Sequence, residues 1–262
     1  MLSYQHAYHA GGAADLHKHL ILAALIDRLT AKPRPISYAE THAGRGLYDL
    51  ASPEAVRTGE AATGIARLTP DPATPFGRAL ATVRAEHGPE AYPGSPLLAA
   101  TLLRPDDHLA LMELHPAEHA ALRHVFRNRP DIDIHRRDGY EGVLALAPMK
   151  PRKGLVLIDP SYEVKDEYAA LSGFVRALLA KWPEATVMIW YPLLPAARHR
   201  EMRAGLRPLE PLVDEVAFIP APARGMTGSG VALLNAPWGS EALIATVHAA
   251  TAGLLAPLTT GR

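Results

Sequence analysis

The sequence predicts an α/β domain built on a mostly parallel sheet. Short aliphatic segments alternate along the chain with longer segments of helical periodicity, which is the pattern of β–α–β units with right-handed crossovers. The segment GLVLI at 154–158 is apolar without interruption, as expected for a strand that is covered on both faces. With 262 residues the chain can bury a large core, so we expect one domain over 1–262.

The elements are predicted in the following order. Residues 13–31 carry apolar side chains at roughly helical spacing and should form an amphipathic helix. Further helices are expected at 116–127 and 166–181. A glycine-containing turn suggests that the last two strands form an antiparallel pair. The predicted strands are 35–40, 108–114, 132–136, 154–158, 185–191, 213–220 and 230–235.

An insertion is predicted between the first two strands. In a dinucleotide-type unit, the acid that closes the second strand lies about 20 residues beyond the first glycine turn. Here Glu113 lies 69 residues beyond Gly44. The excess segment, 48–93, has helical character and follows the first strand directly. It would therefore overhang the ligand-binding edge of the sheet and serve as a small substrate-binding subdomain.

Composition excludes several classes of protein and site. The absence of cysteine excludes disulfides, thiolate metal ligands and cysteine nucleophiles. The 27 basic and 27 acidic residues give a formal net charge of zero, which excludes a strongly basic protein that coats nucleic acid but not a local basic patch. No apolar run has the length of a membrane span, and the first residues lack the layout of a signal peptide. We therefore expect a cytoplasmic protein without membrane contact.

Four successive strands are each followed by polar residues and a turn. Because the carboxyl ends of neighbouring parallel strands lie in one row about 5 Å apart, these residues should converge on one elongated ligand. The four segments are ETHAGRG at 40–46, ELHP at 113–116, DG at 138–139 and DPSY at 159–162.

This row has the chemistry of a site for an adenosine-bearing cofactor. Glu113 can accept both hydrogen bonds of a ribose diol, and Asp138 can accept one from an exocyclic amino group. The turn HAGRGLYDL lacks the third glycine of the G-x-G-x-x-G loop that cradles a pyrophosphate. S-adenosylmethionine, which has no pyrophosphate, is therefore favoured over a nicotinamide cofactor, and a nicotinamide-dependent oxidoreductase is kept as an alternative.

A set of motifs runs in order from the first residue to about Trp238. DPSY at 159–162 differs at one position from D-P-P-[YFW], the signature of enzymes that methylate amino groups of bases. The other segments are MLSYQHAYHAGGAADLHKH, THAGRGLY, YPGSPLLAATLLR, MELHP, RRDGYEGV, GLVLIDPSYE, WYP and RGMTGSGVALLNAPW. Together, with the insertion in the same place, they resemble the RlmJ family of 23S ribosomal RNA adenine-N6 methyltransferases.

The resemblance implies a class I methyltransferase fold, with a seven-stranded, mostly parallel sheet that contains one antiparallel strand. It implies that Asp159 is catalytic and that Tyr4 lies near the substrate base. Ser161 stands where the family has proline, and it should loosen the loop because proline fixes φ. Cofactor contacts are implied at Lys18, His19, His42, Ser95, Glu113, Asp138, Gly139 and Asp159.

The reaction explains why these residue types are needed. The exocyclic nitrogen of adenine is a poor nucleophile because its lone pair is delocalised into the ring. Hydrogen-bond acceptors at the Asp159 carboxylate and the Pro160 carbonyl would favour the pyramidal nitrogen that can attack. Tyr162 would stack on a base taken out of its helix or loop. The alternative for Tyr162 is a ring packed beneath the loop.

We therefore expect a monomeric enzyme that transfers a methyl group from S-adenosylmethionine to N6 of an adenine in 23S ribosomal RNA. The alternatives are adenine methylation of another RNA or of DNA, and a non-catalytic RNA-binding protein whose DPSY loop has drifted. His6, His9, His17 and His19 could be drawn as a metal cluster, but no acid or cysteine completes an obvious set. Because methyl transfer needs no metal, none is expected.

Overall fold

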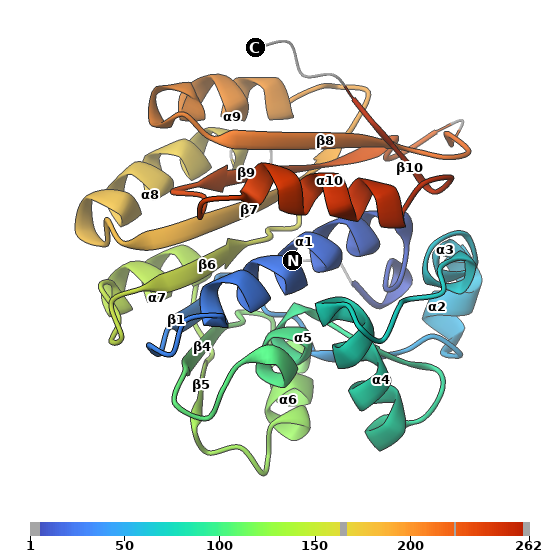
Figure 1. Ribbon diagram of the computed structural model, residues 1–262, viewed down its shortest axis with the longest axis horizontal. Coiled ribbons are helices and arrows are strands. Elements are labelled where there is room, and N and C mark those ends of the chain that lie inside the picture. The colour runs from blue at the N-terminus through green and yellow to red at the C-terminus, as the bar shows by residue number, and fades with distance from the viewer. Residues whose placement is uncertain (1–5, 163–166, 223, 259–262) are drawn as a thin grey trace.

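The computed structural model describes residues 6–162, 167–222 and 224–258. Its main feature is an eight-stranded sheet with the strand order β10-β8-β9-β7-β6-β1-β4-β5 (Figure 1). The strands are β1 (Ser37–Glu40), β4 (His108–Met112), β5 (Ile132–His135), β6 (Gly154–Ile158), β7 (Ala185–Leu193), β8 (Leu212–Phe218), β9 (Gly228–Leu234) and β10 (Leu255–Pro257).

The five neighbouring strands β5, β4, β1, β6 and β7 are parallel, and β9 lies antiparallel between β7 and β8. All seven predicted strands are present, and the class I methyltransferase fold is confirmed. An eighth strand, β10, pairs antiparallel with β8 and was not predicted. Its three residues, Leu-Ala-Pro, are too few to show the alternation that marks a strand.

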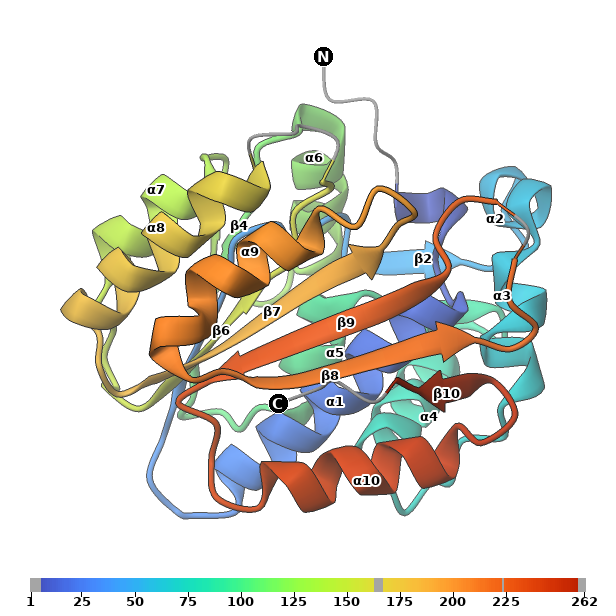
Figure 2. The ribbon, with the colours of Figure 1, turned by 90° about the horizontal axis from the view of Figure 1, so that it is seen from above.

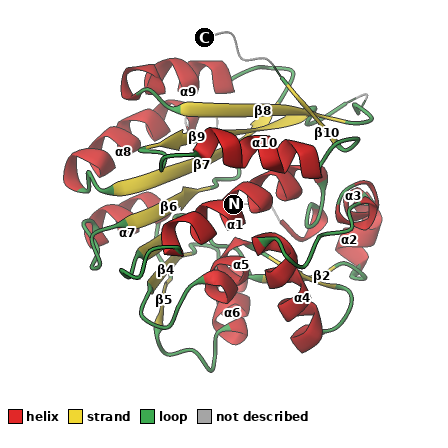
Figure 3. Ribbon diagram, in the orientation of Figure 1, coloured by secondary structure: helices red, strands yellow, loops and turns green. Residues whose placement is uncertain are grey.

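Helices cover both faces of the sheet (Figure 3). Figure 2 shows α1 and α10 on one face and α7, α8 and α9 on the other. Every residue of β1, β6 and β7 is buried as a result. The main helices are α1 (Ala13–Thr30), α5 (Ser95–Leu102), α6 (Pro116–Val125), α7 (Gly139–Leu146), α8 (Glu167–Lys181), α9 (His199–Leu206) and α10 (Ser240–Ala250), and the short 3-10 helices are η1 (His6–Tyr8), η2 (Ile65–Arg67) and η3 (Arg207–Leu209). Within the described part of the chain, none of the helices has the length and apolar character that a membrane crossing requires.

The first helix, α1, is buried on nearly all sides, whereas the sequence predicted an amphipathic helix. It packs against the sheet and against α4 (Pro75–His87), α5 and α10, which leave little of its surface to solvent. Even Asp15 and Lys18 are buried, as are His17 and His19. Because a buried polar side chain is costly without a hydrogen bond, each of these residues needs a partner inside the protein.

The segment between β1 and β4 contains α2 (Pro53–Thr58), α3 (Glu60–Thr63) and α4 (Pro75–His87), together with a small antiparallel sheet of β2 (Leu47–Asp49) and β3 (Ala91–Pro93). In α4, Phe76, Leu80 and Val83 are buried and belong to the same core as α1. In contrast, α2 buries only Ala55, and α3 buries no residue. The segment therefore shares the core of the domain through α4.

Gly154, the first residue of β6, lies directly against Trp182. A Cβ on Gly154 would lie 2.3 Å from Cζ2 of Trp182 and 3.0 Å from the carbonyl oxygen of Ser37. Trp182 is fully buried and its indole N–H donates to the Arg152 carbonyl, so the ring has little room to move. We predict that Gly154→Ala lowers the free energy of unfolding by roughly 1–3 kcal/mol, measured by urea denaturation.

The matched control is Gly173→Ala in α8, because a Cβ at Gly173 would meet no atom within 4 Å. Helix propensity predicts that this control gains roughly 0.5–1 kcal/mol. Equal free energies of unfolding for the two variants would contradict the steric argument.

Candidate active site

A cavity opens at the carboxyl ends of β6, β1, β4 and β5, where the sequence predicts the ligand. The loops that follow these four strands all contribute to its wall. The lining residues include every residue for which a cofactor contact was expected: Lys18, His19, His42, Ser95, Glu113, Asp138, Gly139 and Asp159.

The turn after β1 is held by both neighbouring strands. The Thr41 N–H donates to the Leu157 carbonyl of β6 at 3.1 Å, and the Ala43 N–H donates to the Met112 carbonyl of β4 at 2.9 Å. Gly44 then has a φ of +65°, a left-handed conformation that favours glycine. The backbone is therefore fixed between two strands where it turns beside the cavity.

Glu113 follows β4 and is oriented by two backbone groups. The Gly44 N–H donates to Oε2 at 2.8 Å, and the His115 N–H donates to Oε1 at 2.7 Å. Burial raises the pKa of Glu113, although these hydrogen bonds oppose the change. Each carboxylate oxygen has a second lone pair, so Glu113 can still accept two hydrogen bonds from a ligand.

Asp138 and Gly139 begin α7 at the end of the cavity formed by β5. Asp138 caps the helix, because its Oδ1 accepts a hydrogen bond from the Glu141 N–H at 3.0 Å. A Cβ on Gly139 would lie only 1.8 Å from the Thr41 carbonyl oxygen. Glycine is thus required at 139 for two loops to pack, whether or not a cofactor touches it.

Lys18 and Asp159 form a buried ion pair in the cavity wall. Nζ of Lys18 donates to Oδ2 of Asp159 at 2.6 Å and lies 3.1 Å from Oδ1 of Asp15. Burial would lower the pKa of Lys18, but the two carboxylates outweigh it and raise that pKa. Burial likewise opposes the ionisation of Asp15, yet the charges of His6 and Lys18 hold its pKa well below the usual range. Lys18 therefore stays protonated and engages one oxygen of Asp159.

His19 and His42 are neutral histidines in the cavity wall. Burial lowers the pKa of His19 to about 3 and that of His42 to about 4. Nδ1 of His42 lies 2.8 Å from Oγ1 of Thr41, and Nδ1 of His19 lies 3.0 Å from the Tyr92 hydroxyl. Nε2 of His19 is buried and has no hydrogen-bond partner among the described residues. This nitrogen leaves a place for a polar group of a ligand.

Glu40 supports the site from behind; the sequence placed it among the strand-end residues but gave it no role of its own. It ends β1, is fully buried, and accepts hydrogen bonds from the Tyr38 hydroxyl at 2.6 Å and the Ser95 hydroxyl at 2.8 Å. Burial raises the pKa of Glu40 to about 8. Because Ser95 lines the cavity, Glu40 helps to fix a wall residue. An acid in the last position of a buried strand was the available signal.

Asp15 and His6 also belong to the site and were not predicted to do so. Oδ2 of Asp15 lies 2.9 Å from Nε2 of His6 and accepts the Gly11 N–H at 3.1 Å. His6 itself lines the cavity. The spacing of Asp15 and Lys18, three residues apart on a helix, is the signal that could have shown this cluster.

The residues expected near the substrate have different outcomes. Pro160 lines the cavity beside Asp159, whereas Tyr4 lies outside the described residues. The structure does not bring Tyr162 to the cavity: its side chain is only 7% exposed, and its hydroxyl donates to the Trp190 carbonyl at 2.6 Å. The φ of +56° at Tyr162 turns the ring beneath the loop. This corrects the expectation that Tyr162 stacks on the substrate base and agrees with the packed alternative.

The pKa of Glu40 predicts a pH dependence of stability. The pKa is about 8 in the folded protein and ordinarily 4.5, so between these values the folded protein holds a proton that the unfolded chain has lost. The contribution of this proton to the free energy of unfolding is fully present below pH 4.5. It decreases by up to about 1.4 kcal/mol per pH unit as the pH rises toward 8. We expect Glu40→Gln, which is neutral and of similar shape, to remove this decrease. Urea denaturation across the same pH range measures it.

Glu86→Gln is the control for this comparison, because the Glu86 side chain is 65% exposed. Its free energy of unfolding should follow the pH dependence of the unmodified protein. If the Glu40 and Glu86 variants had parallel pH profiles, Glu40 would not be the titrating group.

Comparison with known proteins identifies the family. Residues 33–262 match the RsmJ family model, described as ribosomal RNA large subunit methyltransferase D, RlmJ. The chain is 36% identical over 252 residues to ribosomal RNA large subunit methyltransferase J of Escherichia coli (strain K12), covering 92% of this chain and 89% of that protein. It is 37% identical over 251 residues to the protein of the same name from Haemophilus influenzae, with the same two coverages.

A solved structure extends the similarity to the whole fold. The crystal structure of a protein from Legionella pneumophila matches with a TM-score of 0.82 at 29% identity, and the match covers 95% of this chain and 97% of that one. The family match includes β1, β4, β5 and β6 and every strand end that forms the cavity. The chain belongs to the RlmJ family of ribosomal RNA large subunit methyltransferases.

Proposed function

We propose that this protein transfers a methyl group from S-adenosylmethionine to the exocyclic N6 of an adenine in 23S ribosomal RNA. One observation carries the proposal: Asp159 follows β6, lies 2.6 Å from Lys18, and faces the same cavity as the other strand-end residues. It opens the loop that resembles the signature of amino-group methyltransferases. The names of the relatives from E. coli and H. influenzae support ribosomal RNA as the substrate.

The chemistry of the cavity suits this cofactor. S-adenosylmethionine carries its methyl group on a positively charged sulfur and would supply it to the attacking nitrogen. Glu113 would accept hydrogen bonds from the ribose diol, and the Asp138 oxygen that does not cap α7 would accept one from the adenine amino group. Nε2 of His19, which has no hydrogen-bond partner among the described residues, would suit a polar group at the amino-acid end. The rest of the wall would be formed by Lys18, His42, Ser95, Gly139 and Asp159.

Asp159 has one oxygen for Lys18 and one for the substrate. Because Oδ2 accepts from Lys18, Oδ1 would accept a hydrogen bond from the target amino group, and the Pro160 carbonyl would accept a second. Two acceptors aimed at the amino hydrogens favour a pyramidal nitrogen with its lone pair directed at the methyl group. Such preorganised groups are usually a large part of catalysis. The proton that the methylated nitrogen loses passes to water.

The target base must leave its stack before it can reach Asp159. Since Tyr162 is packed beneath the loop, other rings are needed to hold the base. His6 and Tyr48 both line the cavity, and their ring centroids lie 5.1 Å apart. Tyr48 is itself only 5% exposed, so we infer that the His6 ring, backed by Tyr48 and with Tyr4 nearby in the sequence, provides the aromatic wall for the substrate base.

The basic residues near the cavity differ in what they can offer to RNA. Arg45 makes a two-pronged ion pair with Glu118, at 2.9 and 2.6 Å, and is thereby already neutralised. Arg136 and Arg137 are exposed in the loop between β5 and α7. These two are the better candidates for phosphate contacts, which depend on exposed cations.

The segment 48–93 is inferred to be the substrate-binding subdomain. Tyr48 at its start and Gly94 just after its end line the cavity, so the segment borders the place where the base would enter. Adenine in another RNA or in DNA remains an alternative substrate, and a non-catalytic RNA-binding protein remains the alternative to an enzyme. The monomeric state and the cytoplasmic location stay predictions.

Asp159→Asn should separate catalysis from binding. Asparagine has one acceptor oxygen, and the buried ammonium of Lys18 will take it, so the amide NH₂ will face the substrate amino group. We expect methyl transfer to fall by roughly 10²–10³-fold, the effect of losing one preorganised group. The affinity for S-adenosylhomocysteine should change little. Tritium transfer from labelled S-adenosylmethionine to protein-free ribosomal RNA, and calorimetry, measure the two quantities.

Asp27→Asn is the control, since the Asp27 side chain is exposed and pairs with Arg78 on the surface. It should leave both quantities unchanged. Undiminished transfer by the Asp159 variant would remove Asp159 from the catalytic centre. If the unmodified protein transferred no label but bound the RNA, the protein would be a binding module.

Replacing 53–63, which contains α2 and α3, by a short Gly/Ser linker should abolish RNA methylation and leave S-adenosylhomocysteine affinity nearly intact. The cut excludes α4, because Phe76, Leu80 and Val83 belong to the common core. Methyl transfer and calorimetry measure the two effects. Loss of both would mean that these helices support the cofactor site, and retention of both would mean that RNA does not use them.

A further inference from the structure

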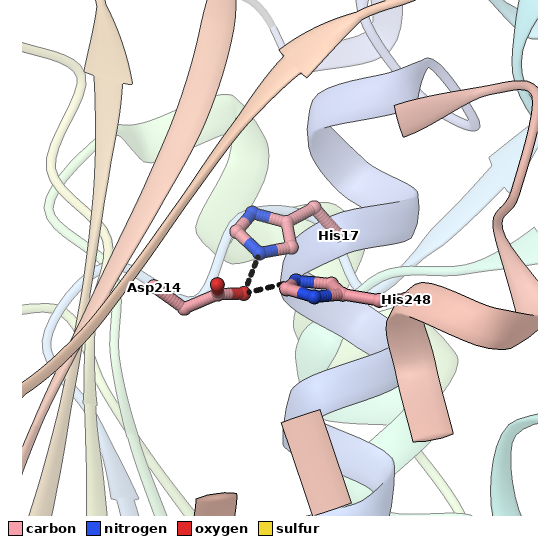
Figure 4. A group of neighbouring side chains, drawn as sticks. All are labelled: His17, Asp214 and His248. Carbon is pink, nitrogen blue, oxygen red and sulfur yellow. Dashed lines mark hydrogen bonds and ion pairs between the residues drawn. The ribbon is translucent and has the colours of Figure 1, made fainter. Parts of the chain in front are cut away.

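Three side chains of the kinds that can bind a metal ion meet between the sheet and the helices α1 and α10. His17 lies on α1, Asp214 on β8 and His248 on α10, and both rings point at the same carboxylate (Figure 4). Nε2 of His17 and Nε2 of His248 each lie 2.9 Å from Oδ2 of Asp214. The ligand atoms of the three residues all lie within 4.8 Å of one another. None of the three lines the cofactor cavity, so the cluster is a separate feature.

The cluster is largely shielded from water and held by rigid elements. The side chains of His17 and Asp214 are 0% and 9% exposed, and that of His248 is 20% exposed. Each residue stands on a regular helix or strand, so the spacing of the ligand atoms does not depend on a loop. The partial exposure of His248 leaves one side of the cluster accessible to an ion and to water.

The hydrogen bonds behind His17 fix the orientation of its ring. Nδ1 of His17 lies 2.9 Å from Oγ of Ser229, and Oγ also accepts the indole N–H of Trp190 at 2.8 Å. Metal-binding histidines typically donate their other ring N–H to an oxygen in this way. Without an ion, Nε2 donates its proton to Asp214. If the ring carried its proton on Nδ1 instead, directed at Ser229, the lone pair of Nε2 would be available to an ion.

We propose that His17, Asp214 and His248 form a binding site for a divalent transition-metal ion of the zinc type, with water as the fourth ligand. Two imidazole nitrogens and one carboxylate oxygen are a frequent ligand set for Zn²⁺. The ligand atoms of the three residues lie within 4.8 Å of one another, so one ion could contact all three. The ion ties α1 to β8 and α10 one residue away from Lys18, and its role is structural.

The experiment uses the full chain, without a polyhistidine tag, after treatment with a chelator and desalting. Zn²⁺ competition with a chromogenic chelator should show one tight site per chain. Co²⁺ should give the intense visible absorption of a four-coordinate site. Zinc at about a hundredfold excess over its Kd should raise Tm by roughly 5 °C.

His248→Gln is the first variant because its partial exposure makes it the least disruptive of the three, and Asp214→Asn is the second. Each should weaken zinc binding at least about 100-fold, since a lost ligand costs more than the 10- to 100-fold of an outer-shell change. The matched control is His108→Gln. His108 lies 2.8 Å from Asp133 in an exposed pair, and no third ligand joins them among the described residues, so this variant should bind zinc like the unmodified protein.

Each outcome decides the proposal. The proposal is supported if the His248 and Asp214 variants, but not the His108 variant, lose the tight site, the cobalt absorption and the thermal shift. The absence of a tight site in the unmodified protein overturns it and leaves a hydrogen-bonded network in its place. Zinc binding that is equal in all variants also overturns it, because the ion would then bind at other histidines.

Discussion

The buried ammonium of Lys18 constrains much of the site. Its side chain is only 4% exposed, and removing such a charge from water costs several kcal/mol unless carboxylates surround it. Asp159 and Asp15 meet this requirement from two directions. Asp15 is in turn held by the Gly11 N–H and by His6. One cation thus links the N-terminal segment, the first helix and the loop after β6, and it leaves one oxygen of Asp159 available to a substrate.

The main features of the site could be predicted from sequence because they depend on strand ends. An uninterrupted apolar run predicts a buried parallel strand, and the residue after the run lies at the carboxyl end of that strand. Glu113 and Asp159 follow such runs directly, whereas Asp138 lies three residues beyond the partly buried strand IDIH at the edge of the sheet. Their convergence could then be inferred from the strand order. Lys18 and His19 could not be found by this argument, since they stand on a helix. They entered through the resemblance, and the structure brings them to the same cavity.

Other features depend on contacts that no local pattern records. The periodicity of 13–31 suggested an amphipathic helix. The helix is present, but packing against the sheet and three helices buries nearly all of it. The raised pKa of Glu40 comes from burial, which is a property of the whole fold. The placement of Tyr162 follows from a left-handed φ of +56°, and a family signature does not specify that angle for this loop. The three residues of β10 form a strand only because β8 offers an edge.

Trp190 connects the two polar clusters that α1 carries. Its ring lies 5.6 Å from Nζ of Lys18, and its indole N–H donates to Ser229, which contacts His17. Its backbone carbonyl accepts the hydroxyl of Tyr162 and so holds the loop that contains Asp159. Lys18 and His17 are neighbours on α1, and their side chains point to different partners. Both are nevertheless held in position relative to Trp190 of β7. The cation of the active site and the histidine cluster behind it therefore share a rigid support, so a change in the packing of Trp190 would be transmitted to both.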